Sequence, residues 1–110
     1  MKFEFSPHIA FQVKNYKQAK EFYEKIIGME VVSASDEETH FKKGGINFYA
    51  ENSDKGHTFF EFKVDDIAGA KKLLEEEGCR ITQVYSERSI MIADPYGMCF
   101  HIWQEADKQQ

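Results

Sequence analysis

Three side chains with different chemistry alternate near the C-terminal end of the sequence. Cys99, His101 and Trp103 are separated by Phe100 and Ile102. If this segment is a β-strand, the thiol, the imidazole and the indole share one face while aliphatic and aromatic surface is buried on the other. Imidazole binds divalent metals or transfers protons, and indole stacks on planar molecules. The spacing therefore predicts a ligand-binding face, and for Trp103 packing at an edge or at a dimer interface is the alternative.

A carboxylate lies inside an otherwise apolar segment. Glu61 stands between Phe60 and Phe62, and in a strand this position points either to solvent or into a binding cleft. Inside a cleft, its carboxyl would hold a proton more readily and could transfer it to a ligand. Gln12 and Lys63 are first expected at the surface, although either could orient a ligand carbonyl or carboxylate.

The hydrophobic pattern predicts two successive groups, each with one strand, one helix and three further strands. Alternating apolar and polar residues indicate the strands, and apolar residues at helical spacing indicate the helices. The first group has a strand within 3–13, a helix over 16–27, and strands near 29–35, 38–43 and 46–51. The second group has a strand at 58–64, a helix from 67, and strands near 80–86, 88–93 and 98–103.

Capping residues predict where the two helices begin and end. Asn15 is expected to cap the first helix with Gln18 three residues later, and Gly28 is expected to end it. Asp66 and Gly78 are expected to do the same for the second helix. The first helix should pack through one apolar face, formed by Tyr16, Ala19, Phe22, Tyr23, Ile26 and Ile27.

The two groups also repeat at the level of individual residues. Residues 11–13 (FQV) match residues 62–64 (FKV), and Ala19-Lys20 matches Ala70-Lys71, at a single offset of 51 residues. An internal duplication explains this agreement better than the alternative, an unrelated α+β sandwich. The same offset makes Phe59 the equivalent of His8, so we expect Phe59 to line the same kind of surface.

Two segments resemble a known family. HIAFQVKNYKQAKEFYEKIIGMEVV is similar to the opening of modules in the glyoxalase, bleomycin-resistance and extradiol-dioxygenase (vicinal oxygen chelate) superfamily. FEFKVDDIAGAKKLLEEEG and IADPYGMCFHIWQ resemble the second module of that family, in which a DP.G turn precedes the last strand. The resemblance implies one α+β domain of two tandem βαβββ modules that form a curled mixed sheet around a cleft. Module one would span about 1–52 and module two about 56–104, followed by a short C-terminal tail.

The resemblance also implies a set of metal-ligand positions. Metal-dependent members carry up to four ligands on the first and last strands of their modules, and two of these positions fall on His8 and His101. The other two fall on Phe59 and Asn47, which are not usual ligands. A zinc, nickel, iron or manganese ion at His8 and His101 would need a carboxylate, for which Glu61 is the candidate, and water. Otherwise both histidines are polar residues of the cleft.

Two functions are compatible with these residues. The first is a metal-free protein that binds a small planar molecule, as the drug-sequestering resistance members of the family do. The alternative is a metal-dependent glyoxalase-type lyase, isomerase or dioxygenase that uses His8 and His101, with Glu61 moving a proton. The loss of two ligand positions favours the first. Its cleft would be lined by Gln12, Asn47, Phe59, Glu61, Cys99 and Trp103.

Composition excludes several other classes of protein. A net charge of -5 with no basic stripe argues against nucleic-acid binding. No phosphate loop, dinucleotide fingerprint or nucleophile elbow is found. Without an apolar run of signal or membrane-span length, a cytoplasmic location is expected, with Cys79 and Cys99 as free thiols. Open sheet edges and the family resemblance favour a homodimer, and residues 107–110 are expected to form a frayed tail.

Overall fold

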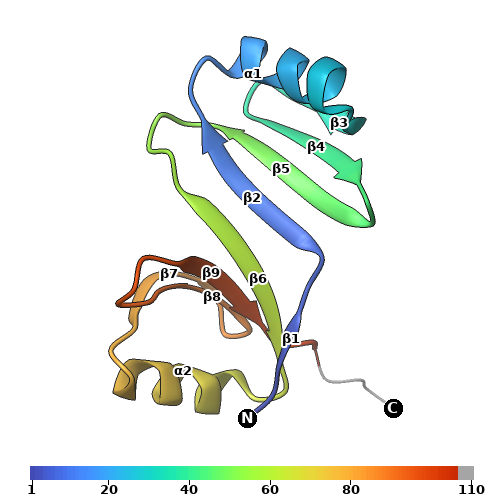
Figure 1. Ribbon diagram of the computed structural model, residues 1–110. Helices are drawn as coiled ribbons and strands as arrows, with labels where there is room; N and C mark the ends of the chain where they lie inside the picture. Colours follow the sequence, from blue (N-terminus) through green and yellow to red (C-terminus); the bar gives the residue numbers. More distant parts are fainter. Residues whose placement is uncertain (107–110) are drawn as a thin grey trace. The chain divides into compact units, whose positions relative to one another are not determined.

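The computed structural model describes residues 1–106, so the predicted tail at 107–110 lies outside the described residues. The chain forms two compact units. One consists of Pro7–Phe59, and the other combines Met1–Ser6 with residues 60–106. Each unit pairs one helical segment with a small sheet (Figure 1), and the α+β class expected from the sequence is confirmed.

The unit Pro7–Phe59 has a mixed sheet in the order β3-β4-β5-β2. β2 pairs parallel to β5, whereas β4 is antiparallel to both β3 and β5. The first residues of β6, Thr58 and Phe59, pair with Phe11 and Ala10 of β2. The elements are β2 (His8–Val13), α1 (Tyr16–Phe22), the π-helix η1 (Tyr23–Ile27), β3 (Glu30–Ala34), β4 (Glu38–Lys43), β5 (Ile46–Asn52) and the start of β6 (Thr58–Val64).

One face of this sheet carries the core of the unit. Phe41 and Ala50 are fully buried there, and the Tyr16 ring of α1 is buried with them. The Tyr16 hydroxyl donates to the Ser35 carbonyl at 2.9 Å and forms a buried hydrogen bond with the Thr39 hydroxyl. Because side chains alternate along each strand, the residues between these core positions lie on the opposite face.

The first helix departs from the sequence prediction at both ends. Asn15 does not cap it through its side chain but adopts a left-handed conformation with φ of 51°, which asparagine tolerates better than most residues. After Phe22 the helix widens into η1 and ends at Gly28, as predicted. Hydrogen bonds in a π-helix close after five residues rather than four, so later side chains rotate off the apolar face. Ile26 and Ile27 are 71% and 42% exposed, and Phe22, which precedes the widening, is 49% exposed, so the predicted packing of these three residues was wrong.

The other unit has its strands in the order β6-β9-β8-β7, and β1 pairs with β6. The predicted strand over 3–13 is divided at Ser6 and Pro7, because proline cannot donate a backbone hydrogen bond to a ladder. Asp66 caps the helix as predicted, accepting a hydrogen bond from the Gly69 amide. The elements are β1 (Phe3–Phe5), β6, α2 (Ile67–Glu76), β7 (Arg80–Ser86), β8 (Ser89–Ala93) and β9 (Cys99–Trp103).

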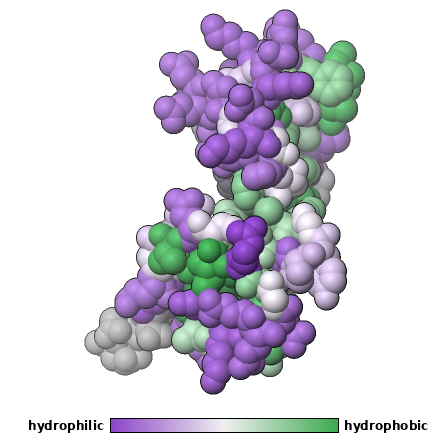
Figure 2. All heavy atoms as spheres, turned by 90° about the vertical axis from the view of Figure 1, so that its left-hand side faces the viewer, coloured by the Kyte–Doolittle hydropathy of each residue, from purple (hydrophilic) through white to green (hydrophobic). Residues whose placement is uncertain are grey.

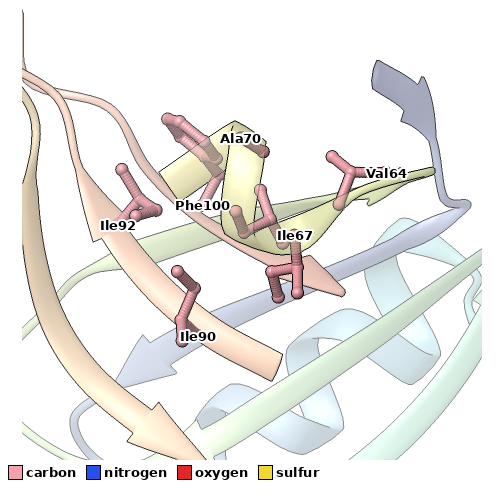
Figure 3. Close-up of a cluster of buried hydrophobic side chains, with 7 residues drawn as sticks. Val64, Ile67, Ala70, Ile90, Ile92 and Phe100 are labelled. Carbon is pink, nitrogen blue, oxygen red and sulfur yellow. The ribbon is translucent and has the colours of Figure 1, made fainter. Parts of the chain in front are cut away.

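The core of this unit lies between α2 and one face of its sheet (Figure 3). Ala70, Ile92 and Ile102 are fully buried, and the Phe62 and Phe100 rings meet edge to face. Alternation along β6 and β9 therefore places Glu61, Lys63, His101 and Trp103 on the face away from α2. The buried cluster consists of Val64, Ile67, Ala70, Ile90, Ile92, Phe100 and Ile102. No helix formed by residues 1–106 has the length and apolar character that crossing a lipid bilayer requires.

Candidate functional site

Glu61, His101 and Ser89 form a hydrogen-bonded row across β6, β9 and β8. His101 Nδ1 lies 3.1 Å from Glu61 Oε1, and His101 Nε2 is hydrogen-bonded to Ser89 Oγ. The His101 and Glu61 side chains are 24% and 20% exposed, so water reaches them only partly. The Tyr85 ring and the imidazole are arranged edge to face, with their centroids 5.7 Å apart. Both nitrogens of the imidazole therefore have a hydrogen-bonding partner.

Trp103 lies on the same face of β9 and is held at two points. Its indole Nε1 donates to Ser6 Oγ at 3.0 Å, and Lys63 Nζ lies 5.6 Å from the centre of its ring. Lys63 also pairs with Glu105, and that hydrogen bond raises the pKa of the lysine. The indole is thus fixed in one orientation, with a cation beside its ring.

The two cysteines are free thiols in the described part of the chain. Cys99 is half-buried and shares the parity of His101 along β9, as the sequence predicted. Cys79 packs against the core, and burial, with the charges of Asp94 and Glu77, raises the pKa of its thiol. A raised pKa makes Cys79 a poor nucleophile at neutral pH.

A second polar group lies in the unit Pro7–Phe59, on the sheet face opposite α1. The Tyr49 hydroxyl is 3.2 Å from His8 Nδ1. The His40 and Tyr49 rings are stacked, with their centroids 4.6 Å apart and an angle of 16° between the ring planes. His40 Nε2 is 2.7 Å from Asn47 Oδ1, and Asn47 Nδ2 donates to the Pro7 carbonyl. The three adjacent strands β2, β5 and β4 thus hold two imidazoles, a phenol and an amide in one network.

Phe59 and Gln12 belong to that same face by register. Phe59 pairs with Ala10, which lies two residues from His8 along β2, so the aromatic ring shares the face of His8. Gln12 Oε1 accepts a hydrogen bond from the His57 amide at 3.1 Å. Gln12 therefore anchors the segment that enters β6.

The predicted site residues divide equally between the two units. His8, Gln12, Asn47 and Phe59 lie in Pro7–Phe59, and Glu61, Cys99, His101 and Trp103 lie in the other unit. The structure brings Glu61 to His101 by hydrogen bonding and Asn47 opposite His8 by strand pairing. That His8 and His101 share one ligand remains a prediction.

Sequence reasoning missed three residues of these networks, namely His40, Tyr49 and Ser89. A signal existed for each, because alternation separates His40 from the buried Phe41, Tyr49 from Ala50 and Ser89 from Ile90. Their partners could not be read without the strand register, which depends on the turns.

The residues of each unit do not match a divalent-metal site. Among residues 1–106, no group of three or more His, Cys, Asp or Glu side chains is arranged to hold an ion. At His101, a metal would have to displace either Ser89 or Glu61, since each nitrogen of the ring already has one of them as a partner. A neutral imidazole has a single lone pair on its ring nitrogens. When Glu61 accepts from Nδ1 of His101, that lone pair is on Nε2 and faces Ser89.

A family model identifies the family of the chain, and solved structures share its fold. The family model of the Glyoxalase/Bleomycin resistance protein/Dioxygenase superfamily matches residues 6–102. A superfamily member from Vibrio splendidus 12B01 is similar in structure, with a TM-score of 0.71, 17% identity, and coverage of 94% of this chain and 100% of that one. No curated protein sequence matches the chain.

Two further solved structures share the fold. Homoprotocatechuate 2,3-dioxygenase from Arthrobacter globiformis has a TM-score of 0.72 and 15% identity, and the match covers 99% of this chain but 38% of the dioxygenase. A hypothetical protein from Bacillus halodurans C-125 has a TM-score of 0.66 and 13% identity, with coverage of 99% and 97%. At such low identity these similarities establish the fold and leave the chemistry to the site residues.

Proposed function

The chain belongs to the glyoxalase/bleomycin resistance protein/dioxygenase superfamily, and we propose that it binds a small planar molecule without a catalytic metal. One observation carries the proposal: both histidines at ligand positions of the family already have hydrogen-bonding partners in their own units. His8 meets the hydroxyl of Tyr49, and His101 meets Glu61 and Ser89. Histidines held in this way serve as polar groups of a binding surface.

Aromatic rings supply the rest of the proposed surface. One unit offers the stacked His40 and Tyr49 rings together with Phe59, and the other offers Trp103 with Lys63 beside it. Rings fixed by hydrogen bonds lose little freedom when a planar ligand stacks on them. We propose sequestration as the role, in the manner that the bleomycin-resistance part of the family name describes, with Gln12, Asn47, Glu61 and Cys99 as polar contacts.

Binding can be followed directly because Trp103 is the only tryptophan. Titration of planar aromatic compounds, bleomycin among them, should quench its fluorescence, and calorimetry should give one dissociation constant. Elemental mass spectrometry of the purified protein should find no stoichiometric transition metal, and a chelator should leave the dissociation constant unchanged. Stoichiometric metal together with loss of binding on chelation would refute the metal-free proposal and support the metal-dependent alternative.

Paired variants assign the ligand to a surface. If it stacks on the His8 face, Phe59→Ala should weaken binding about two- to tenfold, the range expected for one aromatic contact. If it stacks beside Lys63, Trp103→Leu should do so instead, measured by calorimetry. Phe22→Ala, at a ring of α1 that is 49% exposed, is the matched control and should bind like the unmodified protein. Equal binding by all three variants would contradict stacking on either surface.

We also propose that the protein acts as a homodimer in the cytoplasm. β3 and β7 end the strand order, and Val32 and Val84 on them are 47% and 64% exposed. Apolar surface is visible among hydrophilic side chains in Figure 2. Exposed strand edges bearing apolar residues favour pairing with a second chain. Light scattering at micromolar concentration should give twice the chain mass, and a monomer would contradict the proposal.

A further inference from the structure

We propose that Ser89 is a nucleophile that His101 activates and Glu61 orients, so that the protein can accept an acyl group from an activated ester. This activity is distinct from ligand binding and from any metal-dependent reaction. The groups that would carry it are Glu61, His101 and Ser89, which come from three adjacent strands of one unit.

The hydrogen bonds give the row a direction. An ionised carboxylate can only accept, so Glu61 Oε1 receives the proton of His101 Nδ1 across 3.1 Å. The neutral imidazole then carries its lone pair on Nε2, and the Ser89 hydroxyl must donate to it. The proton of Ser89 therefore points at a base, and the oxygen lone pairs remain for an electrophile. A serine, an imidazole and a carboxylate bonded in this order form the arrangement that serine hydrolases on unrelated folds use.

The backbone holds these groups in place. Ser89 pairs with Trp103 of β9 and with Ser86 of β7, and His101 pairs with Met91 of β8. Strand-borne groups are positioned more precisely than loop-borne ones. The Tyr85 ring packs against the imidazole, with the two ring planes nearly perpendicular. Ser89 is half-buried at the first position of β8, so a small electrophile can reach the hydroxyl.

The proposed step conserves atoms and charge. Ser89 Oγ attacks the ester carbonyl carbon, an O–C bond forms, and the hydroxyl proton moves to His101 Nε2. The bond from the carbonyl carbon to the leaving oxygen then breaks, and that oxygen leaves as an alcohol or phenol with the proton from Nε2. Water attacks the acyl-serine with the same base and releases the carboxylic acid. The substrate class that fits this step is an ester of a small acyl group with a good leaving group, because such a leaving group departs with little assistance.

A fluorophosphonate probe tests the nucleophile without requiring turnover. The Ser89 oxygen would bond to phosphorus, fluoride would leave, and the proton would pass to His101. Mass spectrometry of the intact protein should show one added label, and peptide mapping should place it on Ser89. Ser89→Ala should abolish labelling, whereas Ser33→Ala, at an exposed serine of β3, should label like the unmodified protein. A label at another residue, or equal labelling of Ser89→Ala, would overturn the proposal.

Variants of the two supporting residues test activation separately from folding. His101→Asn should slow labelling and p-nitrophenyl acetate hydrolysis by about 10²- to 10⁴-fold, the usual contribution of a general base. Glu61→Gln can donate to Nδ1 and so place the ring proton on Nε2, and it should slow both reactions on the order of 10²-fold. Glu61→Asp keeps the carboxylate and should recover part of that loss.

Thermal unfolding of each variant checks that the fold is retained. If Ser89 labels equally fast in the unmodified protein, His101→Asn and Glu61→Gln, the row is only a structural network and the inference fails. Ligand binding measured by calorimetry is independent of this result, because Ser89→Ala leaves the aromatic contacts in place.

Discussion

The buried hydroxyl pair of Tyr16 and Thr39 should be a measurable stabilising unit. Thr39 is fully buried, and its hydroxyl is hydrogen-bonded to the phenol of Tyr16. Tyr16→Phe removes that bond and leaves a buried polar group short of a partner, which costs roughly 1–3 kcal/mol. The Ser35 carbonyl also loses a donor, but Ser35 is exposed and water can replace it. We therefore expect Tyr16→Phe to lower the unfolding free energy by about 2 kcal/mol.

A double-mutant cycle separates this pair from the packing of the ring. Thr39→Val alone should cost about 1–2 kcal/mol, because the phenol keeps its bond to the Ser35 carbonyl. The double variant removes both polar groups and should be more stable than the sum of the single losses predicts, by about 1 kcal/mol. Urea unfolding followed by circular dichroism gives all three free energies. Strictly additive losses would show that the two hydroxyls are not coupled and would refute the reasoning.

Three further outcomes follow from other parts of the fold. Ile92→Ala should cost about 2–5 kcal/mol in urea unfolding, since Ile92 is fully buried and the substitution leaves a cavity; a loss below about 1 kcal/mol would mean that neighbouring side chains fill the cavity. Asp66→Ala should cost about 1 kcal/mol by the same measurement, because the Gly69 amide loses its acceptor. Burial first, and Glu51 opposite it second, raise the pKa of Glu38. The folded state then binds that proton more tightly than the unfolded chain does, so Glu38 costs stability above its raised pKa and the cost disappears as pH falls toward the ordinary value of 4.5. Glu38→Gln should accordingly raise the melting temperature at pH 7 but not at about pH 4, and an equal rise at both would contradict it.

Much of the fold could be read from local patterns. The strands at 58–64 and 80–86 have the predicted bounds, because their alternation is strong and turn residues flank them. Asp66 caps its helix as expected, since a cap needs only the amides of the next turn. Features decided within a few residues were therefore accessible to sequence reasoning.

Features that depend on partners distant in the sequence could not be predicted from the sequence. Asparagine at position 15 is compatible both with a side-chain cap and with a left-handed backbone, and the local sequence does not decide between them. The widening of the helix after Phe22 is not visible in the spacing of apolar residues. In the candidate sites, His101 and Glu61 could be proposed from strand parity. Ser89 could not, because its bond to His101 depends on the register of β8 against β9.

The N-terminal strand β1 folds against residues that lie far along the sequence. Phe3 pairs with Val64, and the Ser6 hydroxyl accepts from the Trp103 indole although the two residues lie 97 positions apart. β1 can therefore pair only after Val64 has been synthesised, and Ser6 can accept from the indole only after Trp103 has been synthesised. Contacts so distant in sequence form late and slow folding. Deleting Met1–Ser6 would thus destabilise the unit that contains β7, β8 and β9.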